Sequence, residues 1–316
     1  MKLNEPLVWF YACLYVLALA VAVWRRKAFP LADALTVLLI AGFGFTGLVY
    51  FVAPPLVISP VPPLVQPAEL VFTVAYLAVT AALLVRGAPV PKVWKDQFFK
   101  KGLVTILFKL LVFVLIPLSA VRVLWATPWG SLGFTAGDVF GQLRSAALLI
   151  LILGGFNLLI GGGAAPIRAR QFSTGQVTLG LGLAFLWNTI EVGLVEEFFF
   201  RGFLQTRLIG FLGIPTSGIV AASLLFGLAH VPGIYLRRGG KHGPLGEQPT
   251  LLNSILYAIL ALSPTGWFMG LLFWRTQSLF APILVHAAVD AVAHTAEFLE
   301  GLGFQKRIGT QVSAQP

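Results

Sequence analysis

The sequence is poor in charge and contains almost no cysteine. Lys, Arg, Asp and Glu make up 11% of the 316 residues, against roughly 25% in a typical soluble domain, while 58% are hydrophobic. A soluble chain could not cover its surface with so few charges, and a disordered chain would not be this apolar. The single cysteine, Cys13, excludes an intramolecular disulfide and a cysteine zinc site, and it gives no support to a cysteine nucleophile. What is left is a polytopic membrane protein.

Nine apolar runs approach the roughly 20 residues that a spanning helix needs. They lack the period-two alternation typical of membrane strands. The runs are Leu7–Val23, Leu31–Ala53, Leu70–Val85, Leu103–Val121, Ala146–Ile160, Leu179–Phe200, Ile214–Val231, Leu251–Trp274 and Leu279–Phe298. The sequence therefore predicts an all-α, polytopic transmembrane helical bundle with about eight or nine spanning helices.

In a membrane protein, the net charge of +10 does not indicate a nucleic-acid partner. The placement of the basic residues instead predicts how the chain is oriented in the membrane. Basic residues of membrane proteins gather in cytoplasmic loops and near anionic lipid head groups. The basic segments 25–27 and 86–101 each follow an apolar run, so both should be cytoplasmic. This predicts an N-terminus outside and a C-terminus in the cytoplasm, and it assigns Arg201 and Arg207 to loops on the outer side.

Polar residues inside the apolar runs are concentrated after residue 186, and this divides the chain. Lys109 and Asp33 are exceptions in the first half. We interpret residues 1–163 as transmembrane helices of unassigned role, 164–300 as the functional core and 301–316 as a short polar tail.

Three groups of ionisable residues lie within apolar runs, where they are costly and thus functional candidates. The first is Glu196-Glu197 followed by Arg201, the second ends at His230, and the third is His286 with Asp290. Each contains a pair at i,i+4, which shares one helix face. Singly, each has a structural explanation: an ion pair, a helix-end histidine and an i,i+4 hydrogen bond. Together they indicate a catalytic site.

Adjacent residues of a helix point in different directions, so Glu196 and Glu197 cannot face the same partner. Glu197 can pair with Arg201, which leaves Glu196 to face a cavity and act as a general base on water shared with His230. Simple hairpin packing puts Glu196 and His230 at different depths. If the helix that carries Glu196 continues through Arg207, Glu196 moves toward mid-membrane.

The patterns Glu-Glu-x-x-x-Arg, Phe-x-x-x-His and Ala-Pro-Ile-Leu-Val-His-x-x-x-Asp resemble those of the CPBP intramembrane proteases. This family includes the type II CAAX prenyl endopeptidases and the bacterial Abi-type enzymes, and the resemblance covers roughly residues 180–298. It implies an intramembrane endopeptidase that hydrolyses a peptide bond of a membrane-associated or lipidated protein substrate.

The resemblance also implies roles for the matching residues. Glu196, assisted by His230, would activate water, and His286 with Asp290 would fall at the oxyanion positions. The residues that support the site would be Glu197, Arg201 and Phe226. CAAX-processing members commonly carry Asn at the position of Asp290, and an ionised carboxylate repels an oxyanion. Asp290 would therefore have to be protonated, orient His286 or bind metal, and a prenylated substrate is less strongly implied.

A zinc site is the alternative to glutamate-activated water. Glu196, His230, His286 and Asp290 are ligand types that zinc accepts. However, the sequence lacks His-Glu-x-x-His, and four protein ligands would leave no position for water. We therefore favour catalysis without metal or another cofactor.

Two other classes of function stay open. One is a non-proteolytic membrane chaperone or immunity-like partner on the same scaffold, although such a protein does not need three convergent ionisable groups. The other is a proton-coupled transporter that uses those groups as a relay, which the absence of an internal repeat counts against.

Overall fold

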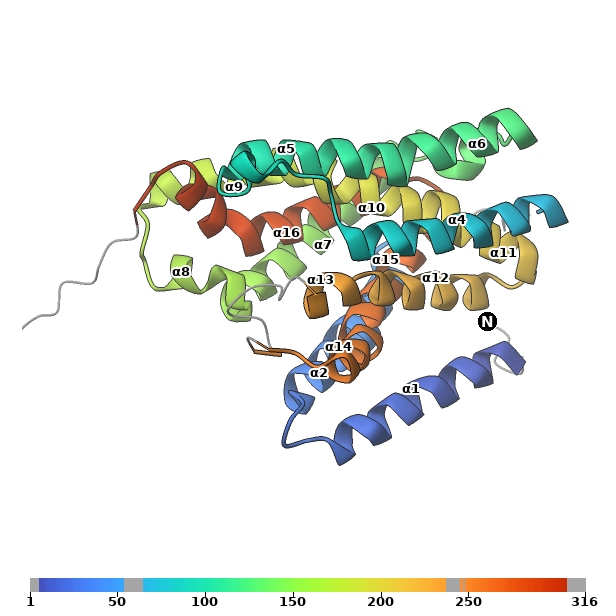
Figure 1. Ribbon diagram of the computed structural model, residues 1–316, viewed down its shortest axis with the longest axis horizontal. Helices are drawn as coiled ribbons and strands as arrows, with labels where there is room; N and C mark the ends of the chain where they lie inside the picture. The colour runs from blue at the N-terminus through green and yellow to red at the C-terminus, as the bar shows by residue number, and fades with distance from the viewer. Residues whose placement is uncertain (1–5, 54–64, 237–244, 247, 306–316) are drawn as a thin grey trace, which may run out of the picture.

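The computed structural model describes residues 6–53, 65–236, 245–246 and 248–305 (Figure 1). The structure is 83% helical and the described ranges contain no strand, which confirms the all-α prediction. The part of the tail from residue 306 onward lies outside these ranges. The helices are α1 (Pro6–Trp24), α2 (Leu31–Val37), α3 (Thr46–Val52), α4 (Pro67–Arg86), α5 (Phe98–Lys109), α6 (Ile116–Trp125), α7 (Val139–Ile160), α8 (Ala165–Arg168), α9 (Thr174–Asn188), α10 (Val195–Glu197), α11 (Thr206–Leu212), α12 (Pro215–Ala229), α13 (Val231–Leu236), α14 (Leu251–Tyr257), α15 (Ser263–Thr276) and α16 (Phe280–Gly301).

Eight stretches of the described chain are long and apolar enough to cross a membrane, and each matches a predicted run. They are Leu7–Trp24, Leu31–Val52, Pro67–Arg86, Phe98–Trp125, Val139–Ile160, Thr174–Leu212, Pro215–Leu236 and Leu251–Thr276. The ninth run forms α16, a helix of 22 residues that is not among these eight. Its two histidines and its acidic residues lower its hydropathy, and the same residues made it a functional candidate.

The helix that carries Glu196 is much longer than the apolar run that predicted it. It extends without interruption over Thr174–Leu212, 39 residues, with π-helical turns at Thr189–Leu194 and Phe198–Gln205. Ser173 and Gln176 form a capping box at its start, and Gly213 ends it with a φ of +69°, a conformation that favours glycine. The continuation through Arg207 puts Glu196 near the middle of the helix, which removes the difference in depth from His230.

Helices packed around this long helix hold it inside the bundle. α16 packs against α9 and α7, and α12 packs against α15 and α11. Figure 1 shows α5 and α6 along one edge of the bundle and α1 along the opposite edge. The site region therefore lies in the interior, between these outer helices.

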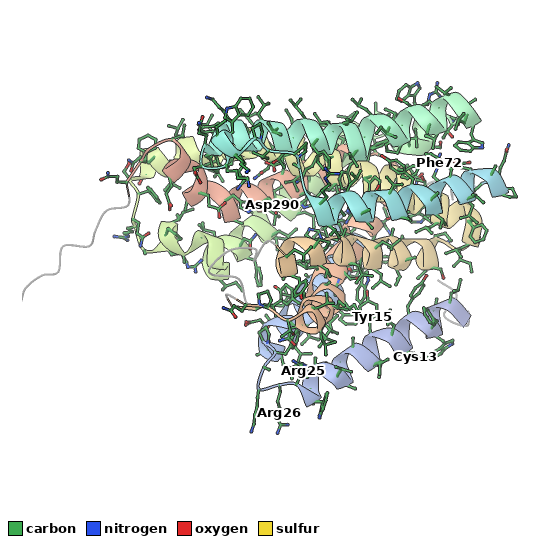
Figure 2. All side chains as sticks on the ribbon, in the orientation of Figure 1. Cys13, Tyr15, Arg25, Arg26, Phe72 and Asp290 are labelled. Atoms are coloured by element: carbon green, nitrogen blue, oxygen red, sulfur yellow. The ribbon has the colours of Figure 1, made fainter. Side chains whose placement is uncertain are left out.

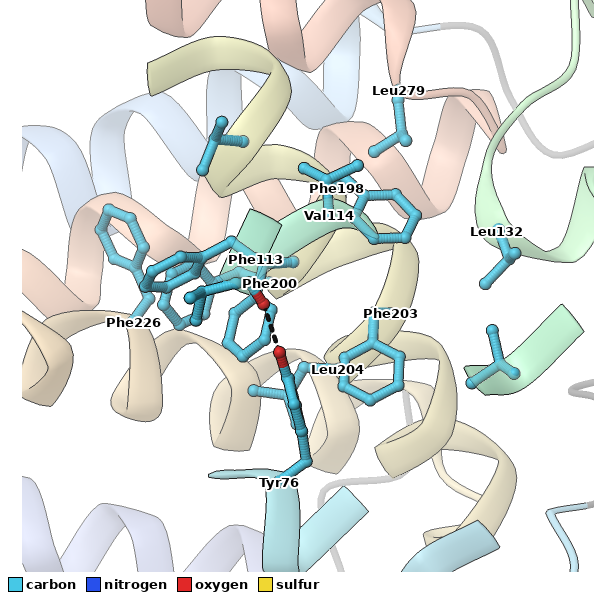
Figure 3. Packing of buried hydrophobic residues seen from close by; sticks show 14 of the residues in the cluster. Tyr76, Phe113, Val114, Leu132, Phe198, Phe200, Phe203, Leu204, Phe226 and Leu279 are labelled. Atoms are coloured by element: carbon cyan, nitrogen blue, oxygen red, sulfur yellow. Dashed lines mark hydrogen bonds between the residues drawn. The ribbon is translucent and has the colours of Figure 1, made fainter. Parts of the chain in front are cut away.

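An aromatic core surrounds the second half of the long helix. Phe198, Phe199, Phe200 and Phe203 are all buried and pack with Phe226 and with residues of α4 and of the segment between α5 and α6. In Figure 3 the hydroxyl of Tyr76, in α4, reaches a main-chain oxygen of this cluster; it donates a hydrogen bond to the carbonyl of Val112 at 2.5 Å. That carbonyl lies in a π-helical turn, Leu110–Leu115, immediately after Lys109.

The assignment of Arg201 and Arg207 to outer loops is wrong. Both lie within the long helix and both are buried, with 2% and 1% of their surface exposed. Arg207 pairs with Glu69 of α4, whose Oε1 accepts from its Nε at 2.8 Å. The prediction counted the basic residues between apolar runs as loop residues. Such a count cannot recognise an arginine whose charge is neutralised by a carboxylate inside the bundle.

Candidate active site

One cavity of about 750 Å³ brings together polar side chains from both halves of the chain. Its wall is built by segments that are far apart in the sequence, from α4 at one extreme to α16 at the other. The polar residues that line it are Lys109, Glu191, Glu196, His230, Tyr257 and His294. The remaining lining residues are mostly apolar, so a group of polar side chains is surrounded by hydrophobic ones.

Glu196 lies in α10, between the two π-helical turns, and faces this cavity. Only 15% of its side chain is exposed, and its Oε1 is 3.6 Å from the Nζ of Lys109. Its position agrees with the sequence-based expectation of a cavity-facing carboxylate. The sequence did not indicate its charged neighbour, Lys109.

His230 follows α12 directly and lines the same cavity. Its Nδ1 lies 2.8 Å from the carbonyl oxygen of Phe226, one turn earlier in the helix. Because a carbonyl oxygen only accepts, Nδ1 carries the proton, and Nε2 of the neutral ring is an acceptor. The structure therefore brings Glu196 and His230 to one cavity, each with an oxygen or nitrogen that can accept a hydrogen bond from water.

Glu197 is fully buried and has different partners from Glu196. Its Oε2 lies 3.2 Å from Nε of Arg201, the i,i+4 pair that the sequence predicted. Its Oε1 accepts a hydrogen bond from Nδ1 of His286 at 2.6 Å. This second contact joins the long helix to α16, and it was not predicted because the two residues are 89 positions apart.

Phe226 connects these two groups of polar residues. Its ring lies under the guanidinium of Arg201, with 4.7 Å from Cζ to the ring centroid, a cation–π contact. The same ring packs edge to face against His230 at 4.8 Å and against His286 at 6.2 Å. Figure 3 shows it beside Phe200 at one side of the aromatic core. Phe226 thus separates the Glu197 group from the cavity and holds the His230 ring.

Asp290 and His294 continue the face of α16 that begins with His286; Asp290 is labelled in Figure 2. Oδ2 of Asp290 is 3.9 Å from Nε2 of His286, which is longer than a hydrogen bond. Nδ1 of His294 donates to the carbonyl oxygen of Asp290 at 2.9 Å, and its ring lines the cavity. The i,i+4 hydrogen bond that was the structural explanation for His286 and Asp290 is therefore not formed.

Sequence reasoning did not assign four polar members of the cavity to the site: Lys109, Glu191, Tyr257 and His294. Nζ of Lys109 donates to the carbonyl oxygen of Glu191 at 3.3 Å and lies 3.7 Å from its Oε1. The indole nitrogen of Trp187 also donates to Oε2 of Glu191. The sequence did contain a signal for Lys109. A single lysine inside the apolar run Leu103–Val121 needs a partner of opposite charge in the membrane.

The four residues that could bind zinc do not converge on one point. Nδ1 of His286 is hydrogen-bonded to Glu197 and Nδ1 of His230 to a backbone carbonyl, so only Nε2 of each ring could bind a metal. Among the residues that the structure describes, no three His, Cys, Asp or Glu side chains are grouped so as to hold a metal ion. This geometry does not fit the set Glu196, His230, His286 and Asp290 as zinc ligands.

Comparison with known proteins identifies the segment that contains these residues. Residues 178–292 match the family model described as type II CAAX prenyl endopeptidase Rce1-like. Searches of curated proteins and of solved structures found no match. The matched segment contains all three motifs, whereas Lys109 lies outside it.

The match also agrees with a location in the membrane. Eight apolar helices make this an integral, multi-pass membrane protein, and the match to a family of membrane proteases agrees with that location. Residues 178–292 are therefore similar to the type II CAAX prenyl endopeptidase Rce1-like family, and this similarity supports a CAAX-type intramembrane endopeptidase activity in general.

Proposed function

We propose that the protein hydrolyses a peptide bond of its substrate with a water molecule held between Glu196 and His230. The observation that carries this proposal is that both residues line one largely apolar cavity in the interior of the bundle. The carboxylate of Glu196 and Nε2 of His230 are both acceptors, so together they can hold the two hydrogens of one water. A general base needs this kind of contact with the proton that it removes.

The reaction follows from these contacts. Glu196 takes a proton from the water while the water oxygen bonds to the carbonyl carbon of the substrate, and the carbonyl oxygen becomes an oxyanion. Glu196 then returns the proton to the amide nitrogen, the carbon–nitrogen bond breaks, and a carboxylic acid and an amine are formed. The apolar lining lowers the local polarity, which strengthens the electrostatic interactions around the reacting groups.

We propose supporting roles for the residues around this centre. Glu197, Arg201 and Phe226 hold the geometry, because their ion pair and ring contacts are buried. The resemblance places His286 and Asp290 at the oxyanion position, and their facing side-chain atoms lie 3.9 Å apart without a hydrogen bond between them. In the imidazolium form of His286, with Nδ1–H on Glu197, Nε2–H is the donor that would contact the oxyanion.

We favour the glutamate mechanism over zinc, because the described His, Asp and Glu side chains are not grouped so as to hold a metal ion. Metal content measured together with activity tests this point. The protein treated with a chelator and shown to be metal-free should retain its activity, whereas activity that rises and falls with bound zinc would contradict the glutamate mechanism.

We propose the orientation with the N-terminus outside and the C-terminus in the cytoplasm. The basic segments 25–27 and 86–101 support it. The buried positions of Arg201 and Arg207 strengthen it, because they remove two charges from the outer side. Labelling of single cysteines introduced in those loops, in intact cells, checks the assignment.

We propose a lipidated or helical peptide as the substrate. The apolar lining residues are of the type that accepts hydrocarbon, and they include Leu84, Phe113, Phe200, Ile234 and Leu262. The experiment compares a prenylated peptide that ends in a CAAX sequence with a non-lipidated transmembrane peptide, both in liposomes that contain the protein. Products are identified by mass spectrometry.

The catalytic assignment is tested in the same liposomes. Glu196→Gln and His230→Ala should each abolish cleavage while the helical content and the elution volume in detergent stay unchanged. Glu297→Gln is the matched control, because Glu297 is an exposed carboxylate of α16. Cleavage by Glu196→Gln at the rate of the control would refute the mechanism.

A further inference from the structure

Lys109 is the one lysine or arginine among the described residues that line the cavity. It comes from α5, outside the segment that matches the protease family. We propose that Lys109 is a further catalytic residue, whose ammonium group stabilises the oxyanion formed when the water activated by Glu196 attacks the substrate. This inference rests on the proposed function and adds a group that the three motifs do not contain.

The cavity has many acceptors and few donors. Glu191 and Glu196 contribute carboxylates. The Nδ1–H groups of His230 and His294 each donate a hydrogen bond to a backbone carbonyl oxygen. An oxyanion needs donors aimed at the place where its charge develops. Besides the ammonium of Lys109, the described lining offers one further side-chain donor that is neutral, the hydroxyl of Tyr257.

The contacts of Lys109 orient its ammonium without using up its three N–H groups. One N–H donates to the carbonyl oxygen of Glu191 at 3.3 Å. The carboxylate oxygens of Glu191 and Glu196 lie at 3.7 Å and 3.6 Å, longer than the roughly 2.7–2.9 Å of a charge-assisted hydrogen bond. One quarter of the side chain is exposed. Two N–H groups can therefore reach a substrate oxygen.

The movement of charge during the step makes this placement useful. Before the attack, the negative charge is on Glu196, 3.6 Å from Nζ of Lys109. When the water proton moves to Glu196, that carboxylate becomes neutral, and the electron pair of the carbonyl bond moves to the substrate oxygen. The ammonium then loses one anionic neighbour and gains another. Return of the proton to the leaving amine, with cleavage of the carbon–nitrogen bond, consumes the oxyanion.

The first experiment compares Lys109→Met with Lys101→Met in liposomes. Lys101 lies two turns earlier in the same helix and is exposed, so it is the matched control. Removal of one oxyanion donor lowers kcat by about 100- to 1,000-fold. We expect a loss of this size in kcat with little change in KM for Lys109→Met, and no change for Lys101→Met.

The second experiment separates charge from structure within one folded preparation. Cys13 is the only cysteine and is exposed, so Lys109→Cys in a Cys13→Ser background carries a single thiol. Alkylation with 2-bromoethylamine rebuilds an ammonium side chain of the length of lysine, and 1-bromopropane gives a neutral side chain of the same length. The ammonium product should regain kcat, and the neutral product should not.

Three results would overturn the proposal. The first is a kcat for Lys109→Met within threefold of wild type, and the second is equal activity of the two alkylated products. The third is a large kcat loss in Tyr257→Phe without one in Lys109→Met, which would assign the oxyanion to the hydroxyl. Failure of the proposed function has a different signature, because Glu196→Gln would then cleave substrate at the wild-type rate.

Discussion

The buried pair between Arg207 and Glu69 allows a stability prediction that is independent of the catalytic mechanism. Nε of Arg207 donates to Oε1 of Glu69 at 2.8 Å, and its other nitrogens donate to the hydroxyls of Thr206 at 2.7 Å and Thr127 at 3.1 Å. The two charged residues are 1% and 5% exposed. The pair joins α4 to α11, and neither residue lines the catalytic cavity.

Arg207→Met removes the cation and leaves the carboxylate of Glu69 buried without its partner. Loss of one member of a buried ion pair costs about 3–5 kcal/mol, because the remaining charge is still shielded from water. Glu69→Met should cost a similar amount, because it leaves Arg207 uncompensated. The double substitution removes both charges, and it should be less destabilising than the sum of the two single substitutions by about 2 kcal/mol or more.

The assay is a double-mutant cycle in detergent, with unfolding followed by tryptophan fluorescence as the denaturant concentration rises. Peptidase activity measured well below the unfolding transition should stay within a few-fold of wild type. Single substitutions that each cost less than about 1 kcal/mol, or strictly additive effects, would refute the idea that the two charges stabilise each other in a dry interior.

Two further predictions concern close packing near the site. An ideal Cβ on Gly227 would lie 2.4 Å from the carbonyl oxygen of Ala258, so Gly227→Ala should destabilise by about 1–3 kcal/mol in thermal unfolding; Gly182→Ala, which meets nothing within 4 Å, is the control and should not. Tyr76→Phe removes the hydrogen bond to the carbonyl of Val112 and should cost about 1–2 kcal/mol. Unchanged unfolding of Tyr76→Phe would show that this carbonyl has another partner.

The helices were predictable because lipid imposes a simple rule on sequence. A spanning segment must satisfy its backbone internally and expose apolar side chains, so long apolar runs become helices. All nine runs proved helical in the described chain. The end of the Glu196 helix was misjudged at Phe200, because the polar residues from Arg201 to Arg207 looked like a loop. They continue the helix, since Glu197 and Glu69 neutralise the two arginines.

The candidate site was predictable only in part. Glu197 with Arg201 is a local i,i+4 pair, and local spacing can be read from a sequence. The bond from His286 to Glu197 and the approach of Lys109 to Glu196 join distant segments. No spacing rule determines such contacts, since they depend on how the helices pack.

The sequence by itself determined that this is a helical membrane protein and which residue types carry its chemistry, because charge is too costly in lipid to occur there without a partner or a function. Only the tertiary structure decided which charge meets which. It joined Glu197 to His286, placed Lys109 beside Glu196, and brought Glu196 and His230 to one cavity. The physical reason is that pairing in the interior depends on which helix faces come together, and that depends on packing across the whole chain.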